Sequence, residues 1–376
     1  MGKGSLTGRE IVVAGAGVAG FAVARAAALR GAKVHIVEQA AEITEVGAGL
    51  QVSPNGLCVM EAIGLGEALR SVSLAAETVV LRDGRSARRV LTLDLSRSAG
   101  RYLLVHRARL IEVLAEGAQA AGVGVTLDMR VEPGAGSGGD ALTLAADGLH
   151  SAHRAALIGA GAPFFTGQVA WRAVIPDAEP RPHVEVYMGP GRHLVTYPLR
   201  GGLRNIVAVE ERSAWAEEGW HHEDDPSSVR AAFSEFGGRV PDWLGRIERV
   251  NLWGLFRHPV APKWHGQGVA LLGDAAHPML PFLAQGANMA LEDAWVLADC
   301  LARHESRGAA FAAYEALRRT RVSRVVDVAT ANARNYHLSG LRRRLAHGAL
   351  RLVGRVAPGA ALGRFDWLYG HDVTRA

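Results

Sequence analysis

The sequence has few cysteines, no long apolar run and only a small excess of one charge, and each shortage excludes a class of protein. Its 376 residues include two cysteines, Cys58 and Cys300, both in apolar helical contexts. A disulfide framework, a cysteine metal site and a C-x-x-C redox pair are therefore excluded. No segment approaches the roughly 18 consecutive apolar residues that a membrane-spanning helix needs. The net charge of +5 is modest. We therefore expect the arginine clusters Arg318-Arg319 and Arg342 to Arg344 to be solvated helix faces, and we expect no nucleic-acid partner.

The remaining composition is that of an ordinary globular protein of two domains. Hydrophobic residues make up 49% and charged residues 21% of the chain, and the length allows a large core. The first apolar run already belongs to a strand, so we predict no signal peptide and a cytoplasmic location. Residues 221–225 (HHEDD) carry potential metal ligands, but they lie in a polar stretch that ends at Pro226. We predict a solvated loop there and no metal site.

Near the N-terminus, the order of elements predicts a dinucleotide-binding βαβ unit. An apolar run over 11–14 precedes a glycine-rich turn, and an alanine-rich helix over 21–30 and a strand over 33–37 follow it. The strand ends at Glu38, which suits the adenosine ribose hydroxyls, and the glycines allow a tight turn and close approach to a pyrophosphate. The predicted contacts are Gly15, Gly17, Val18, Ala19, Gly20 and Glu38. This fingerprint alone does not choose between NAD and FAD.

The segment from Leu271 to Ala294, LLGDAAHPMLPFLAQGANMALEDA, is the most informative part of the chain. A strand ends at Gly-Asp, a loop with two prolines follows, and a long amphipathic helix begins at Gly286. The carboxylate of Asp274 can accept hydrogen bonds from sugar-like hydroxyls. The free amides of Gly286, Ala287 and Asn288 lie at the positive end of a helix dipole, which stabilises developing negative charge.

This segment resembles the second flavin-binding motif of the single-component FAD-dependent aromatic hydroxylases. A third motif of that family, D-G-x-x-S-x-x-R, matches residues 147–154, where Asp147 and Gly148 would lie near the flavin pyrophosphate. The likeness spans nearly the whole chain. Its details at His106-Arg107, at 171–173 (WRA) and at 366–370 (DWLYG) are most similar to the salicylate and 3-hydroxybenzoate hydroxylase branch. By the resemblance, Arg107 contacts FAD.

The resemblance implies an α/β fold: a discontinuous, Rossmann-like FAD-binding domain with an inserted, mostly antiparallel substrate sheet and C-terminal helices. We predict an FAD-binding domain over 1–75, 101–165 and 259–340, a substrate domain over 76–100 and 166–258, and a helical segment over 341–376. Alternating residues predict substrate-domain strands, and helical patterns follow Ala294. These strands span 168–175, 184–188, 193–199 and 205–210, with a hairpin turn at 189–191, and the helices span about 295–334 and 341–356. The glycine-rich segment 131–143 is shorter than in relatives, so residues 143–146 must supply a strand alone.

The family chemistry assigns roles to residues on the substrate side. A bound flavin accepts hydride from NADH or NADPH and reacts with oxygen to give a flavin hydroperoxide, which hydroxylates a small aromatic substrate. His193 is the predicted base that takes the phenolic proton, with Tyr197 on the same strand face helping to bind the ring. Pro278 would place a backbone carbonyl over the reactive side of the flavin. His277 is expected to be structural or to line the site.

Alternatives remain at this point. The chain is predicted to be an NAD(P)H-dependent flavoprotein monooxygenase that hydroxylates a phenolic acid, such as a salicylate-like or hydroxybenzoate-like compound, as a monomer or homodimer. A second hypothesis is a flavin monooxygenase of a larger polycyclic or quinone-like substrate. A third is a non-catalytic dinucleotide-binding protein.

Overall fold

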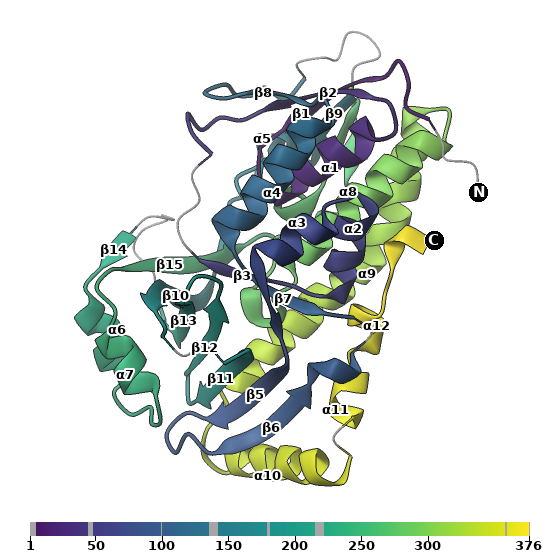
Figure 1. The fold of residues 1–376 in the computed structure, drawn as a ribbon. Helices are drawn as coiled ribbons and strands as arrows, with labels where there is room; N and C mark the ends of the chain where they lie inside the picture. The colour runs from purple at the N-terminus through teal and green to yellow at the C-terminus, as the bar shows by residue number, and fades with distance from the viewer. Residues whose placement is uncertain are drawn as a thin grey trace.

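The computed structural model describes residues 5–43, 48–98, 100–134, 142–178, 181–214, 222–357 and 359–375. Three sheets and two long helices organise these residues (Figure 1). A six-stranded, mostly parallel sheet lies at the top of the view, and an eight-stranded sheet lies at the lower left. The helices α8 (Gly286–Arg303) and α9 (Arg307–Tyr336) run from the first sheet toward the second.

The first sheet carries the glycine-rich turn. Its strands, in spatial order, are β16 (His265–Gly266), β17 (Val269–Leu271), β9 (Leu142–Ala145), β1 (Glu10–Ala14), β2 (Lys33–Val37) and β8 (Gly124–Thr126). Strands β17, β9, β1, β2 and β8 pair in parallel. Their carboxyl ends therefore meet at one edge, which is where an open α/β sheet binds ligands.

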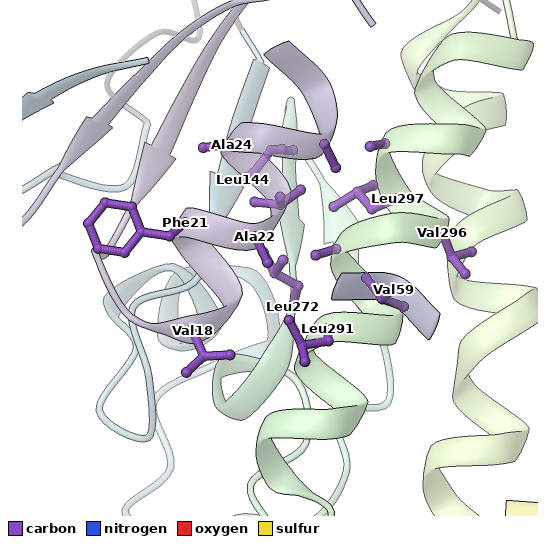
Figure 2. Close-up of a cluster of buried hydrophobic side chains, with 14 of the residues drawn as sticks. Val18, Phe21, Ala22, Ala24, Val59, Leu144, Leu272, Leu291, Val296 and Leu297 are labelled. Carbon is purple, nitrogen blue, oxygen red and sulfur yellow. The ribbon is translucent and has the colours of Figure 1, made fainter. Parts of the chain in front are cut away.

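The main core lies between this sheet and its helices. Helix α1 (Val18–Ala28) packs beside α8, and Figure 2 shows Ala22 of α1 facing Leu291 and Leu297 of α8, with Leu144 of β9 behind. Six of the eight buried residues of α1 are alanine or valine. Small side chains let the two helices approach closely, so the amino ends of α1 and α8 are held near the same sheet edge.

The second sheet is mostly antiparallel. Its strands, in spatial order, are β14 (His222–Asp224), β15 (Val250–Arg257), β10 (Phe164–Pro176), β13 (Leu203–Glu211), β12 (Arg192–Leu199), β11 (His183–Gly189), β5 (Thr78–Asp83) and β6 (Arg89–Asp94). One face is covered by α6 (Pro226–Ala232) and α7 (Val240–Gly245), which bury Trp171 and Trp243. The opposite face points toward Phe282 and α9.

The remaining elements connect these layers. A three-stranded sheet, β3 (Gly49–Val52), β7 (Tyr102–His106) and β4 (Ser73–Ala76), links the two larger sheets. The other helices are α2 (Pro54–Ala62), α3 (Gly66–Ser71), α4 (Arg107–Ala120), α5 (Ala152–Ile158), α10 (Gly340–Val356), α11 (Ala360–Gly363) and α12 (Asp366–Tyr369). Helix α10 lies under β6 at the bottom of Figure 1, where Arg343 pairs with Asp83.

Most predicted elements are confirmed, and two are wrong. The four substrate-side strands, the turn between β11 and β12, and the strand β9 that follows the glycine-rich segment are present. The continuous helix predicted after Ala294 is interrupted over residues 304–306, where Ser306 caps α9 by accepting a hydrogen bond from the amide of Ala309. Residues 222–224 form strand β14 instead of a solvated loop, because Asp224 accepts a hydrogen bond from the indole of Trp171. Residues 135–141 and His221 lie outside the described residues.

No described helix is both long and apolar enough to cross a membrane. No group of three or more histidine, cysteine, aspartate or glutamate side chains within the described ranges is arranged to hold a metal ion.

Candidate functional site

The glycine-rich turn fits a ligand phosphate because its three glycines have different surroundings. A Cβ atom on Gly15, whose φ is +101°, would lie 2.5 Å from the carbonyl oxygen of Ala146. One on Gly20 would lie 1.9 Å from the carbonyl oxygen of Gly15. These two glycines are therefore required by the fold itself. A Cβ on Gly17 would meet nothing within 4 Å, so Gly17 faces the open space that a pyrophosphate would enter at the start of α1.

Glu38 closes this turn from the end of β2. Its carboxylate accepts hydrogen bonds from the amides of Ala16, at 2.7 Å, and Ala40, at 2.9 Å. The turn and Glu38 line a cavity of about 330 Å³. The residues around this cavity also include Asp147, Gly148, His150, His153, Met129 and Arg130. The first and third sequence motifs thus meet at one cavity.

Asp147 is held in place by the helix that follows it. Its Oδ2 atom accepts a hydrogen bond from Nδ1 of His153, at 2.8 Å, and its Oδ1 atom is buried with no hydrogen-bond partner among the described residues. Burial would raise the pKa of Asp147, but the hydrogen bonds from His153 and Ser151 hold it below its ordinary value. The side chain is therefore a carboxylate, and Asp147 lines the same cavity as the glycine-rich turn.

Asp274 and Arg107 form a second part of the site. Gly273, just before Asp274, packs against both long helices, because its Cβ position lies 3.1 Å from Ala19 and 3.5 Å from Ala290. Asp274 is exposed at the surface of the protein, but neighbouring residues remove much of the water around its carboxyl group, and this loss of solvation raises its pKa. The nearby His277 and Arg107 partly oppose that rise. Arg107 is the first residue of α4, and it lies close enough to Asp274 for its charge to lower the pKa of that carboxyl group.

The amino end of α8 presents its backbone. Helix α8 begins at Gly286, so the amides of Gly286, Ala287 and Asn288 have no carbonyl one turn earlier in the helix to bond. The Asn288 side chain is fully buried and is used elsewhere: its Oδ1 accepts from the amide of Ser53, and its Nδ2 donates to the carbonyl of Gln51. Asn288 therefore fastens β3 and α2 to the start of α8, and only its backbone amide faces outward.

A buried ionic network supports this helix end. Asp293 accepts hydrogen bonds from the amide of Gly273, from His277 and from Arg318, and Arg318 also pairs with Glu292. Burial would raise the pKa of Asp293, but the charges of His277 and Arg318 hold it below its ordinary value. These contacts agree with the expectation that His277 is structural or lines the site. The expectation that Arg318 lies on a solvated helix face is wrong, because Arg318 is buried between Glu292 and Asp293. These contacts fix the Gly-Asp turn relative to α8 and α9.

On the substrate side, His193 projects from β12 toward the loop before α8. It is 1% exposed, and its ring lies 5.1 Å from the rings of both Phe282 and Tyr336. Its Nδ1 atom is hydrogen-bonded to Nε2 of His337 at 2.7 Å. Burial first, and His337 second, lower the pKa of His193 well below its ordinary value. A neutral imidazole beside an apolar wall has the state that a general base needs.

Tyr197 lies on the same strand face as His193, about 13 Å farther along the strand. It packs with Tyr102 and Leu104, away from Phe282, and burial raises its pKa. Arg172 of β10 lies on the same face, at a level between the two. It is the cross-strand neighbour of Val207 on β13, which in turn lies opposite Val195 on β12. Its guanidinium stacks on Trp253 at 4.0 Å, and no acidic side chain among the described residues pairs with it. Burial and the nearby Arg107 lower the pKa of Arg172 to about 10.

The structure thus gathers the predicted residues in three neighbouring groups rather than in one cavity. Gly15, Gly17, Glu38, Asp147 and Gly148 share the 330 Å³ cavity. Val18 and Ala19 begin α1 beside it, and Asp274, Arg107 and the start of α8 lie beyond Gly273. His193 and Tyr197 lie on the second sheet, and the buried Pro278 lies in the loop between.

Sequence reasoning missed several residues of the site. Met129 and Arg130 carry no motif, and they reach the cavity because β8, just before them, pairs with β2, which ends just before Glu38. His153 stands at a variable position of the third motif, so the motif did not single it out. Arg172 was noticed in its WRA segment, but the sequence could not show that no acidic side chain of the described ranges pairs with it. His337 had no sequence signal, since it lies 144 residues from His193.

Comparison with known proteins adds the family. A model described as "FAD binding domain" matches residues 9–135 and 141–329. A 3-amino-4-hydroxybenzoate 2-monooxygenase of Streptomyces platensis is 33% identical over 392 residues, which cover 97% of this chain and 96% of that protein. A 3-hydroxybenzoate 6-hydroxylase of Polaromonas naphthalenivorans is 33% identical over 393 residues, covering 96% of each chain.

Solved structures agree with the fold. The crystal structure of Klebsiella pneumoniae HpxO complexed with FAD and uric acid superposes with a TM-score of 0.80 at 25% identity, covering 93% of this chain and 94% of that one. A salicylate hydroxylase substrate complex superposes with a TM-score of 0.80 at 23% identity, covering 99% of this chain and 97% of that one. The discontinuous α/β architecture expected from the sequence is confirmed.

Proposed function

Because the chain belongs to the single-component FAD-dependent aromatic hydroxylases, we propose that it adds one hydroxyl group to a phenolic acid or similar small aromatic compound. NADH or NADPH would supply the electrons and oxygen the new hydroxyl. One observation carries the choice of substrate: His193 lies on one face of the second sheet with Arg172, a cation that no acidic side chain of the described residues pairs with. A ring that carries both an ionisable hydroxyl and a carboxylate matches that pair of groups.

The residues divide the work between cofactor and substrate. FAD, when bound, supplies the redox chemistry. Gly17 and the start of α1 would hold its pyrophosphate, with the Asp147–Gly148 turn close by, Glu38 the adenosine ribose, and Asp274 the ribityl hydroxyls. The amides of Gly286 to Asn288 would stabilise negative charge at the ring end. The fit rests on the open face of Gly17 and on the carboxylate of Glu38, which lines the same cavity.

On the substrate side, the protein binds, orients and deprotonates. The Nε2 atom of His193 would accept the phenolic proton, which makes the ring electron-rich, and Arg172 would pair with the carboxylate. Phe282 and Leu280 form an apolar wall that excludes water from this place. Pro278 would turn a backbone carbonyl toward the cofactor, as the family resemblance implies. Tyr197, which lies beyond Arg172 on the same face, is proposed to help bind the substrate at its carboxylate end.

Replacing the proposed base tests this function. In His193→Ala, NAD(P)H oxidation should continue while hydroxylated product falls by about 10²–10⁴-fold, the range that general base catalysis contributes. Hydrogen peroxide should rise in its place, because a ring that keeps its proton is a poor nucleophile. Higher pH should restore part of the product yield, since the phenol then ionises without help. Product and peroxide are quantified together with the nicotinamide consumed.

A matched control is His347→Ala, which removes a buried histidine on α10 that faces Asp83 instead of the site. This variant should still convert nearly all of the nicotinamide that it consumes into hydroxylated product. Full hydroxylation by His193→Ala at neutral pH would show that another group is the base, and Tyr197 would then be replaced by phenylalanine.

A larger substrate is the second candidate. Leu280 lines a surface groove of about 620 Å³ and also belongs to the apolar wall around Phe282. The groove therefore adjoins the proposed substrate site and could hold the outer part of a larger substrate. Turnover of simple phenolic acids and of bulky phenols, measured side by side, separates the two proposals. The non-catalytic hypothesis is not retained, because relatives that cover nearly the whole chain are named monooxygenases.

We propose in addition that the protein is a cytoplasmic monomer or homodimer. Light scattering of the purified protein measures the assembly, and fractionation of the source cells measures the location.

A further inference from the structure

Three side chains from separate elements form a continuous row of hydrogen bonds from the proposed substrate site to the surface. Nδ1 of His193, on β12, lies 2.7 Å from Nε2 of His337, at the end of α9. Nδ1 of His337 lies 2.7 Å from Oε1 of Glu211, the last residue of β13. The exposed fraction is 1% for His193 and 8% for His337, while the Glu211 side chain is 52% exposed.

The carboxylate at the outer end fixes the direction of both hydrogen bonds. Ionised Glu211 can only accept, so Nδ1 of His337 carries the hydrogen. In a neutral ring, Nε2 of His337 is then an acceptor, and Nδ1–H of His193 donates to it. Burial lowers the pKa of His337, although Glu211 partly opposes this, so a neutral ring is its normal form. Nε2 of His193 therefore keeps its lone pair, and no described residue is hydrogen-bonded to that atom.

The outer end of the row is open to solvent. Glu211 lines the 620 Å³ groove together with Arg212, Arg257 and Arg334. The inner end faces Phe282 and Tyr336. The backbone holds the middle member, since the carbonyl of His337 accepts a hydrogen bond from the amide of Gly191 at 3.4 Å. A helix C-terminus also favours a transient positive charge on His337.

We propose that His193, His337 and Glu211 form a proton-transfer chain between the substrate and the surface groove. The proposal rests on the proposed function only in requiring a bound molecule with an ionisable hydroxyl group. His337 and Glu211 are positioning and proton-conducting residues, because they contact His193 rather than the substrate.

The transfer balances without any redox partner. The substrate O–H bond breaks as its proton moves to Nε2 of His193, and the Nδ1 proton of His193 moves to Nε2 of His337. The Nδ1 proton of His337 then moves to Glu211, which releases it to water in the groove. One proton leaves and no electrons move. When the product departs as a neutral phenol, it takes the proton from Nε2 of His193, and a proton that enters through Glu211 restores both original tautomers.

The test measures proton release on substrate binding, before any turnover. FAD-loaded protein is mixed rapidly with 3-hydroxybenzoate, without oxygen or NAD(P)H, in a weak buffer that contains a pH indicator. The wild type should release protons as phenolate absorbance appears. His337→Gln keeps a hydrogen-bonding side chain at the middle position but cannot relay a proton, so release should slow at least about tenfold while affinity stays within about threefold. Glu211→Gln should also slow release, and more concentrated buffer should restore the rate.

The matched control is Glu210→Gln. Glu210 is the neighbour of Glu211 on β13, but it pairs with Arg192 and Arg212 and not with His337. It should behave as the wild type. Wild-type release in His337→Gln, no proton release by the wild type on binding, or a slow Glu211→Gln that buffer does not restore would each overturn the proposal. Normal proton release without hydroxylation of any phenolic acid would reject the proposed function alone.

Discussion

At the scale of single residues, Asp274 contributes a carboxylate that forms no ion pair with any described residue and stands where the family resemblance places the ribityl chain. Asp274→Ala should lose a charge-assisted hydrogen bond of about 1.5–3 kcal/mol, which weakens FAD binding roughly ten- to a hundredfold. Asp274→Asn, which keeps an uncharged acceptor, should lose less. Asp242→Ala, on α7 at the far face of the second sheet, is the control. Flavin fluorescence titration gives the affinities, and equal values for Asp274→Ala and the wild type would refute the assignment.

Single residues also show the limits of sequence reasoning. His193 could be predicted because a strand pattern and a family position coincide there. Its partner His337 could not, because the hydrogen bond joins a strand to the end of a helix 144 residues later. Arg172 raises the same difficulty: whether an arginine has a carboxylate partner depends on every element packed around it, and the sequence shows only its neighbours in the chain.

At the scale of elements, the glycine-rich turn separates a folding role from a binding role. Gly20→Ala should disrupt the turn, because the new Cβ would lie 1.9 Å from the carbonyl oxygen of Gly15. Gly17→Ala should leave stability nearly unchanged, since nothing lies within 4 Å, but should weaken FAD binding by narrowing the pyrophosphate approach. Urea unfolding without added FAD, followed by FAD titration, distinguishes them. Equal losses of stability in both variants would contradict this division.

The contact between α8 and α9 supports a second prediction at this scale. Arg318 is 1% exposed and pairs with the fully buried Glu292 and Asp293. Arg318→Met should cost about 3–5 kcal/mol of unfolding free energy, because two carboxylates lose a buried partner. The adjacent Arg319→Met should cost at most about 1 kcal/mol, since its pair with Glu315 is half exposed. Denaturant unfolding measures both, and similar losses would show that the buried network adds little.

Element types were largely predictable where the periodicity was strong, as in the strands from β10 to β13. The interruption between α8 and α9 was not predicted, because residues on both sides continue a helical pattern and only the cap at Ser306 divides them. Strand β14 was missed because its polar residues pair with β15 and bond to Trp171, and these contacts are remote in the chain.

At the scale of the whole molecule, the sequence predicts that three distant motifs meet, because one cofactor must touch them all. The structure agrees with this for the residues near 15 and 147, which line one cavity. Gly273, just before Asp274, packs between Ala19 of α1 and Ala290 of α8. How the second sheet faces α9 was not predictable, since that packing depends on Leu280, Phe282 and Tyr336 meeting Ala170 and Val209. The domain bounds stay a prediction.

Buried histidines make the stability of the whole protein depend on pH. Burial is the main cause that lowers the pKa of five buried or half-buried ones: His106, His193, His258, His337 and His347. Below the ordinary value of about 6.5 the unfolded chain therefore binds more protons than the native one. Stability should be complete above about pH 7.5 and should fall as the pH drops through 6.5 toward 5. Carboxylates with lowered pKa values, such as Asp293, also stabilise the native state, and this stabilisation is lost only in more acidic solution.

Urea unfolding of the FAD-loaded protein between pH 8 and 5 measures this slope, to which each neutral buried histidine contributes up to about 1.4 kcal/mol per pH unit. His347→Gln, on α10 and outside the proposed site, should reduce the slope by at most that amount while leaving substrate-dependent turnover unchanged. A stability that does not fall between pH 7.5 and 5 would mean that these histidines gain their protons in the native state, and the neutral form proposed for His193 would have to be abandoned.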